Sequence, residues 1–233
     1  MLSIPSLAAE CDIAHGFSTI PMGSMGITHA TDPDLVAENR RKFARSLNLK
    51  PESMTVVGAV HGSDVARVDQ PVALVKEVDA IVTDRPGVAL FAVFADCYPL
   101  IVYDPSNRAL ALGHAGWRGT EAGIAYKIVE MLEREYGSVA SELCVGIGPG
   151  ICGGCYEVGP EFAGRFSPEV LRPGAGDRFL LDLVEANRRQ FGEAGVQPGR
   201  IWALEQCTLE SDQLFSHRRQ PDGTRFAALA VLR

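Results

Sequence analysis

The longest uninterrupted apolar run in this 233-residue chain, Val88–Ala95, is the feature that most limits what it can form. The run is far shorter than the roughly 20 residues that a membrane-spanning helix needs. It follows a turn sequence, Asp84–Gly87, and a short apolar run bounded in this way is typical of a strand buried on both faces. We therefore expect a buried strand here and no membrane partner.

The rest of the chain alternates irregularly between strand and helix patterns. A helix should begin after Asp32, a good N-cap followed by Pro33 at the first helical position, with an apolar face formed by Leu35, Val36, Phe43 and Leu47. Other expected helices cover Thr120–Tyr136 and Leu180–Ala194. Further expected strands cover His15–Ile20, Met54–Val60, Asp79–Thr83, Pro99–Tyr103, Ala109–Gly113, Leu143–Ile147, Ile201–Leu204 and Phe226–Leu232. This order predicts a single α/β domain over residues 1–233, with a mixed β-sheet and flanking helices.

The composition is that of an ordinary globular protein. Hydrophobic residues make up 46% of the chain, which excludes general disorder. The net charge of −7 argues against binding nucleic acid by charge. The N-terminus, Met1–Pro5, has no basic leader, so we expect a cytoplasmic protein. Six cysteines are too few for a disulfide scaffold, and we interpret them as reduced thiols.

Three metal-binding residue types stand at the ends of expected strands. They are His61 after Met54–Val60, Cys97 after the apolar run, and His114 after Ala109–Gly113. Two imidazoles and a thiolate suit Zn²⁺, and Cu is the alternative. Three protein ligands leave a fourth position open, as in a catalytic zinc site. The alternative is a core cysteine and two hydrogen-bonded histidines without a metal.

The segment after His114 has features of an anion site. Glycines at 113, 116 and 119 permit close backbone approach, and Thr120 can cap the helix that follows. A helix N-terminus beside Arg118 is suited to binding phosphate. We therefore expect Arg118 to take part in catalysis and Thr120 to contact the substrate. The alternative is an ordinary turn with Arg118 on the surface.

Asp96 stands next to Cys97. Its carboxylate is a candidate general base, or a group that fixes the tautomer of a ligand histidine. The alternative is a cap for nearby backbone N–H groups.

The glycine-rich segment Gly148–Glu157 holds Cys152 and Cys155 in a lone Cys-x-x-Cys. A zinc ribbon needs a second pair, and the sequence has none. We interpret this segment as the wall of a cleft, in which Cys155 and Tyr156 contact substrate; a plain surface loop is the alternative. The segment also matches Gly-x-Gly-x-x-Gly, a weak signal here because no good helix former follows.

Several catalytic signatures are missing from the sequence. It has no Walker phosphate loop, no His-Glu-x-x-His and no Gly-x-Ser-x-Gly. The zinc nucleobase deaminase pattern is also missing. Five histidines without a His-x-His pair do not suffice for the several centres of a multicopper oxidase.

Taken together, the motifs resemble the laccase-domain family, also called the YfiH, polyphenol oxidase or purine nucleoside phosphorylase family. The most specific block is His-Ala-Gly-Trp-Arg-Gly-Thr at 114–120. Weaker blocks run in family order over nearly the whole chain, at His15–Thr19, Val60–Gly62, Asp79–Asp84, Ala95–Leu100, Ile147–Ile151, Cys155–Gly159, Cys207–Thr208 and Phe215–Arg219.

The resemblance implies a metal held by His61, Cys97 and His114, and activity on purine nucleosides with phosphate. The implied reactions are phosphorolysis of adenosine, inosine and methylthioadenosine, together with adenosine deamination. Two positions depart from the family pattern: Ile20 stands where an arginine is usual, and Ala59 where glutamine is usual.

Three other functions remain open at this point. A copper-loaded form would oxidise phenols, since a thiolate favours copper. Hydrolysis of a cell-wall precursor would need only a metal-activated water. A non-enzymatic module would close its metal with a fourth ligand such as Cys152 or Cys155.

Overall fold

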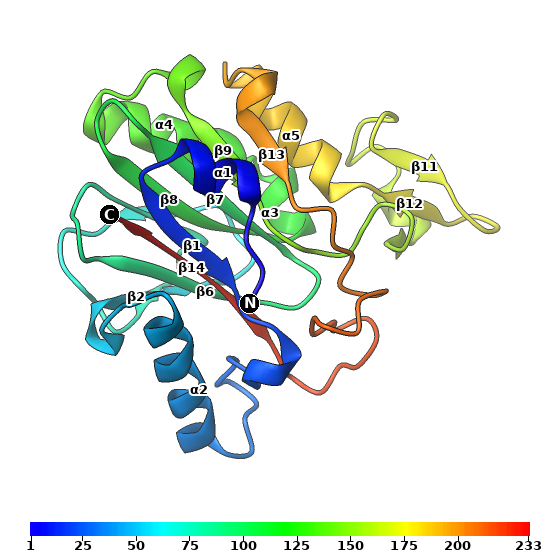
Figure 1. Ribbon diagram of the computed structural model, residues 1–233. Helices are drawn as coiled ribbons and strands as arrows, with labels where there is room; N and C mark the ends of the chain where they lie inside the picture. The colour runs from blue at the N-terminus through cyan, green and yellow to red at the C-terminus, as the bar shows by residue number, and fades with distance from the viewer.

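The computed structural model describes residues 1–233, apart from the side chain of Glu10, and it contains three β-sheets (Figure 1). The five-stranded sheet runs in the order β1 (Ile13–Phe17), β14 (Phe226–Leu232), β6 (Ala89–Phe94), β2 (Met54–Gly58), β4 (Val75–Lys76). The six-stranded sheet runs β13 (Ile201–Ala203), β9 (Cys144–Ile147), β7 (Tyr98–Asp104), β8 (Ala109–Ala115), β5 (Ala80–Thr83), β3 (Val65–Arg67). A small sheet joins β10 (Glu157–Val158), β12 (Phe179–Leu181) and β11 (Leu171–Pro173).

Five α-helices accompany the sheets: α1 (Pro5–Glu10), α2 (Pro33–Ser46), α3 (Trp117–Glu121), α4 (Ile124–Tyr136) and α5 (Leu183–Glu193). Short 3-10 turns lie at Ile20–Met22, Pro51–Ser53, Ala140–Glu142, Pro160–Phe162 and Pro198–Arg200. Among the helices described, none combines the length and the apolar character that crossing a bilayer requires.

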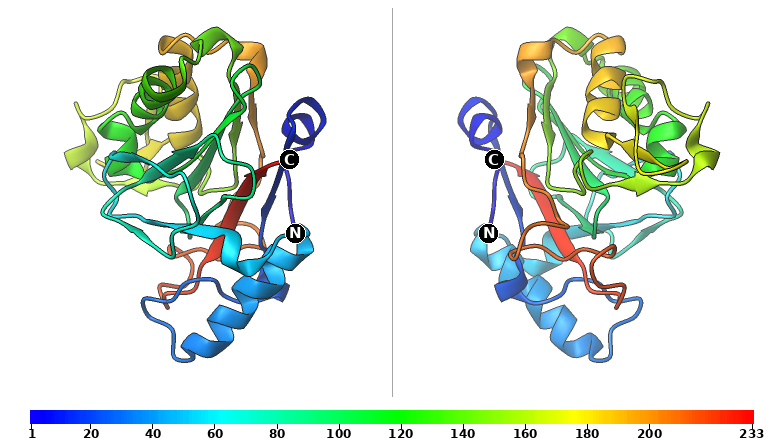
Figure 2. Two further views of the ribbon diagram at one scale, coloured as in Figure 1. Left: turned by 90° about the vertical axis from the view of Figure 1, so that its left-hand side faces the viewer. Right: turned by 90° about the vertical axis from the view of Figure 1, so that its right-hand side faces the viewer.

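The elements form four layers. Helix α2 lies at one side of the molecule and α4 and α5 at the other, with the two large sheets between them (Figure 2). Leu90 and Phe226 of the five-stranded sheet pack with Ile101 and Leu112 of the six-stranded sheet in a core between the sheets. The outer faces of the sheets form two further cores, one with α2 and one with the helices on the far side.

Strand β6 confirms the expectation of a strand buried on both faces. Leu90 and Phe94 point into the core between the sheets, whereas Ala89 and Phe91 pack against the α2 layer. Alternate residues of a strand face opposite sides, so only a continuously apolar sequence satisfies both cores.

The predicted class, mixed α/β with flanking helices, is confirmed. The number of sheets differs, because the strands divide between stacked sheets instead of forming one. The prediction of one continuous helix over Thr120–Tyr136 is wrong. Gly123 adopts a left-handed conformation, with φ of 77°, and separates α3 from α4.

Helix α2 begins as predicted, and the Asp32 carboxylate accepts a hydrogen bond from the Leu35 N–H. The Leu35 side chain, however, is 54% exposed and does not belong to the apolar face. Val36 and Phe43 are buried as expected.

Candidate metal centre and cavity

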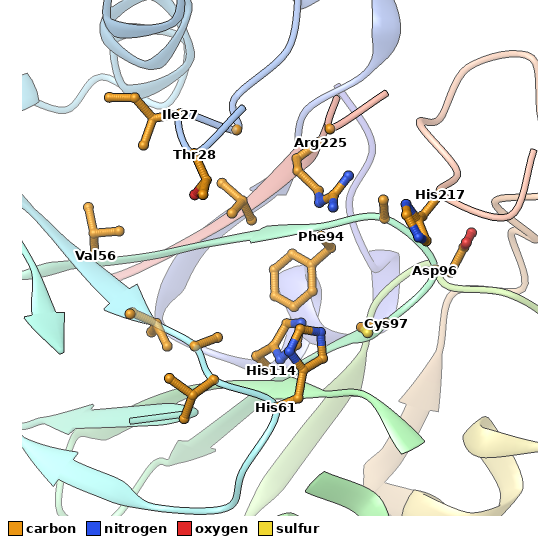
Figure 3. A pocket seen from close by; sticks show the side chains of 18 of the residues that line it. Ile27, Thr28, Val56, His61, Phe94, Asp96, Cys97, His114, His217 and Arg225 are labelled. Carbon is orange, nitrogen blue, oxygen red and sulfur yellow. The ribbon is translucent and has the colours of Figure 1, made fainter. Parts of the chain in front are cut away.

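His61, Cys97 and His114 come together although they are far apart in the sequence. One ligand atom from each lies within 4.8 Å of the other two. Figure 3 shows both imidazole rings beside the Cys97 sulfur, with Phe94 next to them. The Phe94 ring stacks on His114 at 5.3 Å between centroids, and the two imidazoles meet edge to face at 4.9 Å.

The meeting of the two large sheets positions these side chains. The chain leaves β6 in one sheet and enters β7 in the other, and Cys97 lies in this connection. Strand β8 pairs with β7 so that His114 lies opposite Pro99, which brings the imidazole beside Cys97. His61 comes from the turn that follows β2. The trio therefore draws on both sheets.

A fourth residue, Asp79, organises the trio and was not among the predicted site residues. Its carboxylate accepts hydrogen bonds from the backbone N–H groups of Val60, His61 and Gly62, at 3.3, 2.9 and 2.7 Å. The same carboxylate lies 3.3 Å from Nδ1 of His114, which leaves Nε2 as the ring nitrogen available to a metal. The sequence signal for Asp79 is a charged residue directly before the buried strand β5 (Ala80–Thr83).

The backbone around the trio is strained and closely packed. His61 and Asp96 have positive φ angles, 62° and 82°, which residues other than glycine seldom adopt. A Cβ added to Gly116 would lie 2.9 Å from the Cys97 sulfur and 3.3 Å from the His61 ring. Only glycine at 116 therefore lets the loop after β8 pass this close.

Within the trio, Cys97 and His114 stabilise each other's charged forms. Burial alone would raise the pKa of Cys97, but the charge of His114 and hydrogen bonds from both imidazoles outweigh it and lower this pKa to about 6. Burial opposes protonation of His114, yet the Cys97 thiolate and Asp79 raise its pKa to about 9. The cysteine is thus poised as a thiolate.

These properties fit a bound metal ion. A thiolate and two imidazoles, one of them oriented by a carboxylate, form a donor set for Zn²⁺ or Cu. Exposure increases from buried His114 to exposed His61, so one side of the trio faces solvent. Three protein ligands on an open wall leave room for a further ligand.

The trio lines a large cavity of about 1020 Å³. This volume is at the upper end of the range for small-molecule sites, roughly 300–1,000 Å³. Its wall combines aromatic and basic side chains with the trio, among them Phe94, Trp117, Arg118, Tyr156, Arg218 and Arg225. The cavity therefore offers both flat apolar surfaces and positive charge.

Arg118 and Thr120 do not share a site. Arg118 is exposed at the cavity wall, and its guanidinium stacks over the Trp117 ring at 4.3 Å. Thr120 is fully buried inside α3, where its hydroxyl accepts a hydrogen bond from the Asn187 amide at 3.0 Å. Thr120 therefore caps no helix, because α4 begins after Gly123.

Asp96 lines the cavity, but both of its oxygens have partners. One accepts a hydrogen bond from the Thr208 hydroxyl at 2.6 Å, and the other from the Arg218 backbone N–H at 2.7 Å. This matches the capping alternative for Asp96. The carboxylate that contacts the His114 ring is that of Asp79.

Some side chains of the glycine-rich segment after Gly148 line the cavity, and others belong to a separate cluster of cysteines. Ile151 and Tyr156 line the cavity, and the Arg218 guanidinium lies over the Tyr156 ring at 5.3 Å. Burial raises the pKa of Tyr156 to about 12, so its phenol stays protonated. Cys155 lies outside the cavity lining and belongs to a second group that can hold a metal, formed by Cys152, Cys155, Cys207 and Glu210.

Of the two residues that depart from the family pattern, Ala59 and Ile20, only one lines the cavity. Ala59 lies in the cavity lining. Ile20 begins a 3-10 turn outside the lining, where its N–H donates to the Gln213 carbonyl.

A mixed α/β protein with a histidine–cysteine–histidine set open to a large cavity is of the class that can carry a catalytic metal. The chain belongs to the family described as multi-copper polyphenol oxidoreductase laccase, whose sequence model matches residues 10–233.

Relatives of known name cover almost the whole chain. A purine nucleoside phosphorylase of Deinococcus radiodurans is 36% identical over 96% of this chain and 89% of its own length. The purine nucleoside phosphorylase YfiH of Escherichia coli is 29% identical over 98% and 95%. The crystal structure of YlmD from Geobacillus stearothermophilus superposes with a TM-score of 0.88, at 33% identity over 96% of this chain and 93% of that one.

Proposed function

We propose that this chain is a metal-dependent purine nucleoside phosphorylase. The observation that carries the proposal is the His61, Cys97 and His114 cluster in the wall of a cavity that also presents aromatic and basic side chains. A nucleoside and phosphate need these features, because the base has flat apolar faces and phosphate is an anion. The names of the relatives from Deinococcus and Escherichia support the same reaction.

In this proposal His61, Cys97 and His114 hold the metal ion, with Zn²⁺ favoured and Cu as the alternative. When bound, the ion supplies Lewis-acid chemistry and makes water a better nucleophile at neutral pH. Asp79 fixes the His114 ring through Nδ1 and supports the turn that carries His61. The protein's own task is thus to preorganise three ligands.

Arg118 is the proposed phosphate contact. Its guanidinium makes no hydrogen bond with the protein among the interactions described, so its N–H groups are available to an anion at the cavity wall. Tyr156 is the proposed contact for the purine, since its phenol stays protonated and can donate a hydrogen bond. Thr120 and Cys155 receive no substrate role here, because neither lines the cavity.

The proposed reaction is displacement at the sugar. A phosphate oxygen attacks C1′ of the ribose while the bond from C1′ to the purine nitrogen breaks. The bonding electrons leave with the purine, which takes up a proton. Arg118 would hold the attacking phosphate in position, which supplies the proximity term of the rate enhancement.

Adenosine deamination is the second proposed activity of this cavity. Water replaces the exocyclic amine of adenine, inosine forms and ammonia leaves. The reaction consumes no phosphate, so it is separable from phosphorolysis in the same assay.

The ligand sets favour nucleoside chemistry over multicopper oxidation. Among the described residues, two groups can hold a metal, and only the cavity trio contains histidine. A multicopper oxidase needs several copper centres built largely from imidazoles. Hydrolysis of a cell-wall precursor remains a different outcome of the test below.

The test is a product assay with the zinc-loaded protein. Adenosine, inosine and methylthioadenosine are incubated with and without phosphate, and products are separated by mass. We expect phosphate-dependent release of the base with a ribose phosphate, and phosphate-independent inosine from adenosine. Lack of turnover with metal confirmed bound would overturn the proposal and direct attention to cell-wall amides.

Variants assign the roles. His114→Ala should abolish both reactions, and full activity in this variant would refute the metal-centred site. Arg118→Ala should raise KM for phosphate while leaving deamination unchanged. Arg41→Ala, an exposed arginine on α2, is the matched control and should change neither reaction.

A further inference from the structure

A second cluster of metal-binding side chains lies outside the cavity trio. Cys152, Cys155, Cys207 and Glu210 each present one ligand atom, and the four atoms lie within 4.8 Å of one another. The three thiols are not joined by disulfides. The cavity chemistry proposed above uses none of these groups.

The cluster consists of two short turns with the same spacing. Cys152 and Cys155 are three residues apart, and so are Cys207 and Glu210. The Cys155 N–H donates to the Cys152 carbonyl at 2.9 Å, which closes the first turn, and the two sulfur atoms lie within 4.8 Å of each other. The second pair that a zinc ribbon needs therefore exists, with a carboxylate in place of one thiol.

The backbone fixes the two turns against each other. Gly150 and Cys207 form a bridge, and the Thr208 N–H donates to the Gly150 carbonyl at 2.9 Å. The Cys152 N–H points at the Cys207 sulfur at 3.3 Å, an arrangement that stabilises negative charge on sulfur. Ordering of the ligands is therefore already achieved by the fold.

The distances suit a small tetrahedral ion. Zn–S bonds of about 2.3 Å and Zn–O bonds of about 2.1 Å place tetrahedral ligand atoms about 3.6–3.8 Å apart. The Cys152 Sγ and Glu210 Oε2 atoms are 3.9 Å apart. The four ligand atoms, all within 4.8 Å of one another, therefore need to draw together by up to about 1 Å for one zinc ion to bind all of them.

Positive charge lies close to both turns. The Arg172 guanidinium donates to the Gly153 carbonyl at 3.0 Å in the first turn. The Arg219 guanidinium donates to the Thr208 and Leu209 carbonyls at 2.9 and 3.0 Å in the second. Three thiolates and a carboxylate around a divalent ion leave two negative charges, and these two arginines carry positive charge at the same turns.

We propose that Cys152, Cys155, Cys207 and Glu210 form a second, structural metal site that takes a thiophilic divalent ion, Zn²⁺ above all. Four protein ligands close the coordination shell, which distinguishes this site from the open trio in the cavity. Sulfur donors in a tetrahedral arrangement select zinc over hard cations such as magnesium. Binding displaces the thiol protons into solvent.

The proposed metal site is connected to the cavity wall through hydrogen bonds. Thr208, between two of the ligands, donates its hydroxyl to Asp96, and the Asp96 carbonyl accepts from the Ile151 N–H at 2.9 Å. Asp96 and Ile151 both line the cavity. A metal ion would therefore hold together two segments about fifty residues apart in sequence, at the place where they support the connection between the sheets.

The experiment uses Co²⁺ as the probe, with full-length protein that has been stripped of metal and kept reduced without oxygen. The Cys97→Ser variant removes the cavity trio and leaves the second cluster intact. We expect this variant to bind one Co²⁺ per chain, with sulfur-to-cobalt charge transfer and the strong visible bands of tetrahedral cobalt. Adding Cys207→Ser should abolish both signals.

A second pair of variants tests the role of the Glu210 carboxylate. Glu210→Gln in the Cys97→Ser background should weaken cobalt binding at least tenfold, whereas Glu205→Gln, an exposed neighbour outside the cluster, should leave it unchanged. Absence of cobalt binding by Cys97→Ser, or a spectrum that Cys207→Ser does not alter, would overturn the proposal.

A measurement on the unmodified protein covers the case in which Cys207→Ser fails to fold. The zinc-loaded and stripped proteins are alkylated at cysteine, and the modified positions are read by mass spectrometry. Zinc should slow alkylation of Cys152, Cys155 and Cys207 together by at least tenfold. Equal alkylation with and without zinc would refute the site.

Discussion

At the scale of single residues, the candidate metal centre depends on a group that is not itself a ligand. Asp79 is fully buried, and burial alone would raise its pKa, but hydrogen bonds from His114 and from the Val60–Gly62 turn outweigh burial and lower the pKa. The ionised carboxylate thus fixes both histidines at once, one through its ring and one through its backbone.

Replacing Asp79 with Asn should weaken zinc binding by the cavity trio about 10–100-fold, because the amide cannot accept all four hydrogen bonds. Competition with a coloured chelator measures the Kd, and circular dichroism reports whether the fold is retained. Asp64→Asn, at a side chain that is 80% exposed, is the control. An unchanged Kd in a folded Asp79→Asn protein would show that Asp79 does not position the ligands.

His15 gives a pH dependence that is independent of any metal. Burial, helped by the charge of Arg233, lowers the pKa of His15 to about 4, and its Nε2 accepts the Ile4 N–H at 2.9 Å. Between pH 6.5 and about 4, His15 is protonated in the unfolded chain but stays neutral in the folded protein. Stability from this group is therefore complete above pH 6.5 and declines as the pH falls toward 4, by about 3 kcal/mol in total.

Urea unfolding at a series of pH values tests this prediction. His15→Gln keeps an acceptor oxygen but does not titrate, so its free energy of unfolding should lack this decline. The difference between the two proteins isolates His15 from other titrating groups. His29→Gln, at an exposed position, should follow the unmodified protein. Parallel pH curves for the unmodified and His15→Gln proteins would contradict the assignment.

At the scale of elements, β8 shows how closely a helix can approach a sheet. Ala109 and Ala111 present only methyl groups to the helical layer, and Gly113 presents none. A Cβ at Gly113 would lie 2.6 Å from the Cδ1 atom of Ile128 on α4. Small residues on one face of β8 therefore determine how close α4 lies to the sheet, up to Gly113, the residue before His114.

Gly113→Ala should lower the free energy of unfolding by about 1–3 kcal/mol through overpacking. Adding Ile128→Val removes the clashing methyl, so the double variant should be more stable than the sum of the two single changes. Gly192→Ala on α5, where an added Cβ meets no atom within 4 Å, should be neutral or stabilising. Additive effects of Gly113→Ala and Ile128→Val would rule out this contact.

At the scale of the whole molecule, the ends of the chain meet in one sheet. Strand β1 pairs antiparallel with β14, and β14 pairs with β6 at the centre of the five-stranded sheet (Figure 1). The core between the sheets draws on both large sheets. The single domain expected over residues 1–233 remains a prediction, which an unfolding experiment tests.

If residues 1–233 form one cooperative unit, unfolding should be a single transition for every probe. Trp117 packs beside the helical layer and Trp202 beside the core between the sheets, so replacing either with Phe leaves a fluorescent probe of the other layer. Both probes and far-ultraviolet circular dichroism should give the same urea midpoint. Separate midpoints for the two tryptophans would indicate two folding units.

Local patterns in the sequence determined much of this protein. The apolar run Val88–Ala95 requires burial on both faces, and Asp32 with Pro33 places the start of α2, because both signals depend on neighbouring residues alone. The ligand types at 61, 97 and 114 were readable as a trio from their places at strand ends and from the family resemblance.

Only the tertiary structure decided how distant segments meet. The division of the strands into stacked sheets depends on long-range pairing, such as β1 with β14, that no local pattern encodes. For the same reason, neither Asp79 nor the pair Cys207 and Glu210 could be assigned to a site from the sequence. The hydrogen bonds from Thr208 and Arg218 to Asp96 also could not be predicted. A side chain's chemistry is set by what contacts it, and those contacts form only when the whole chain folds.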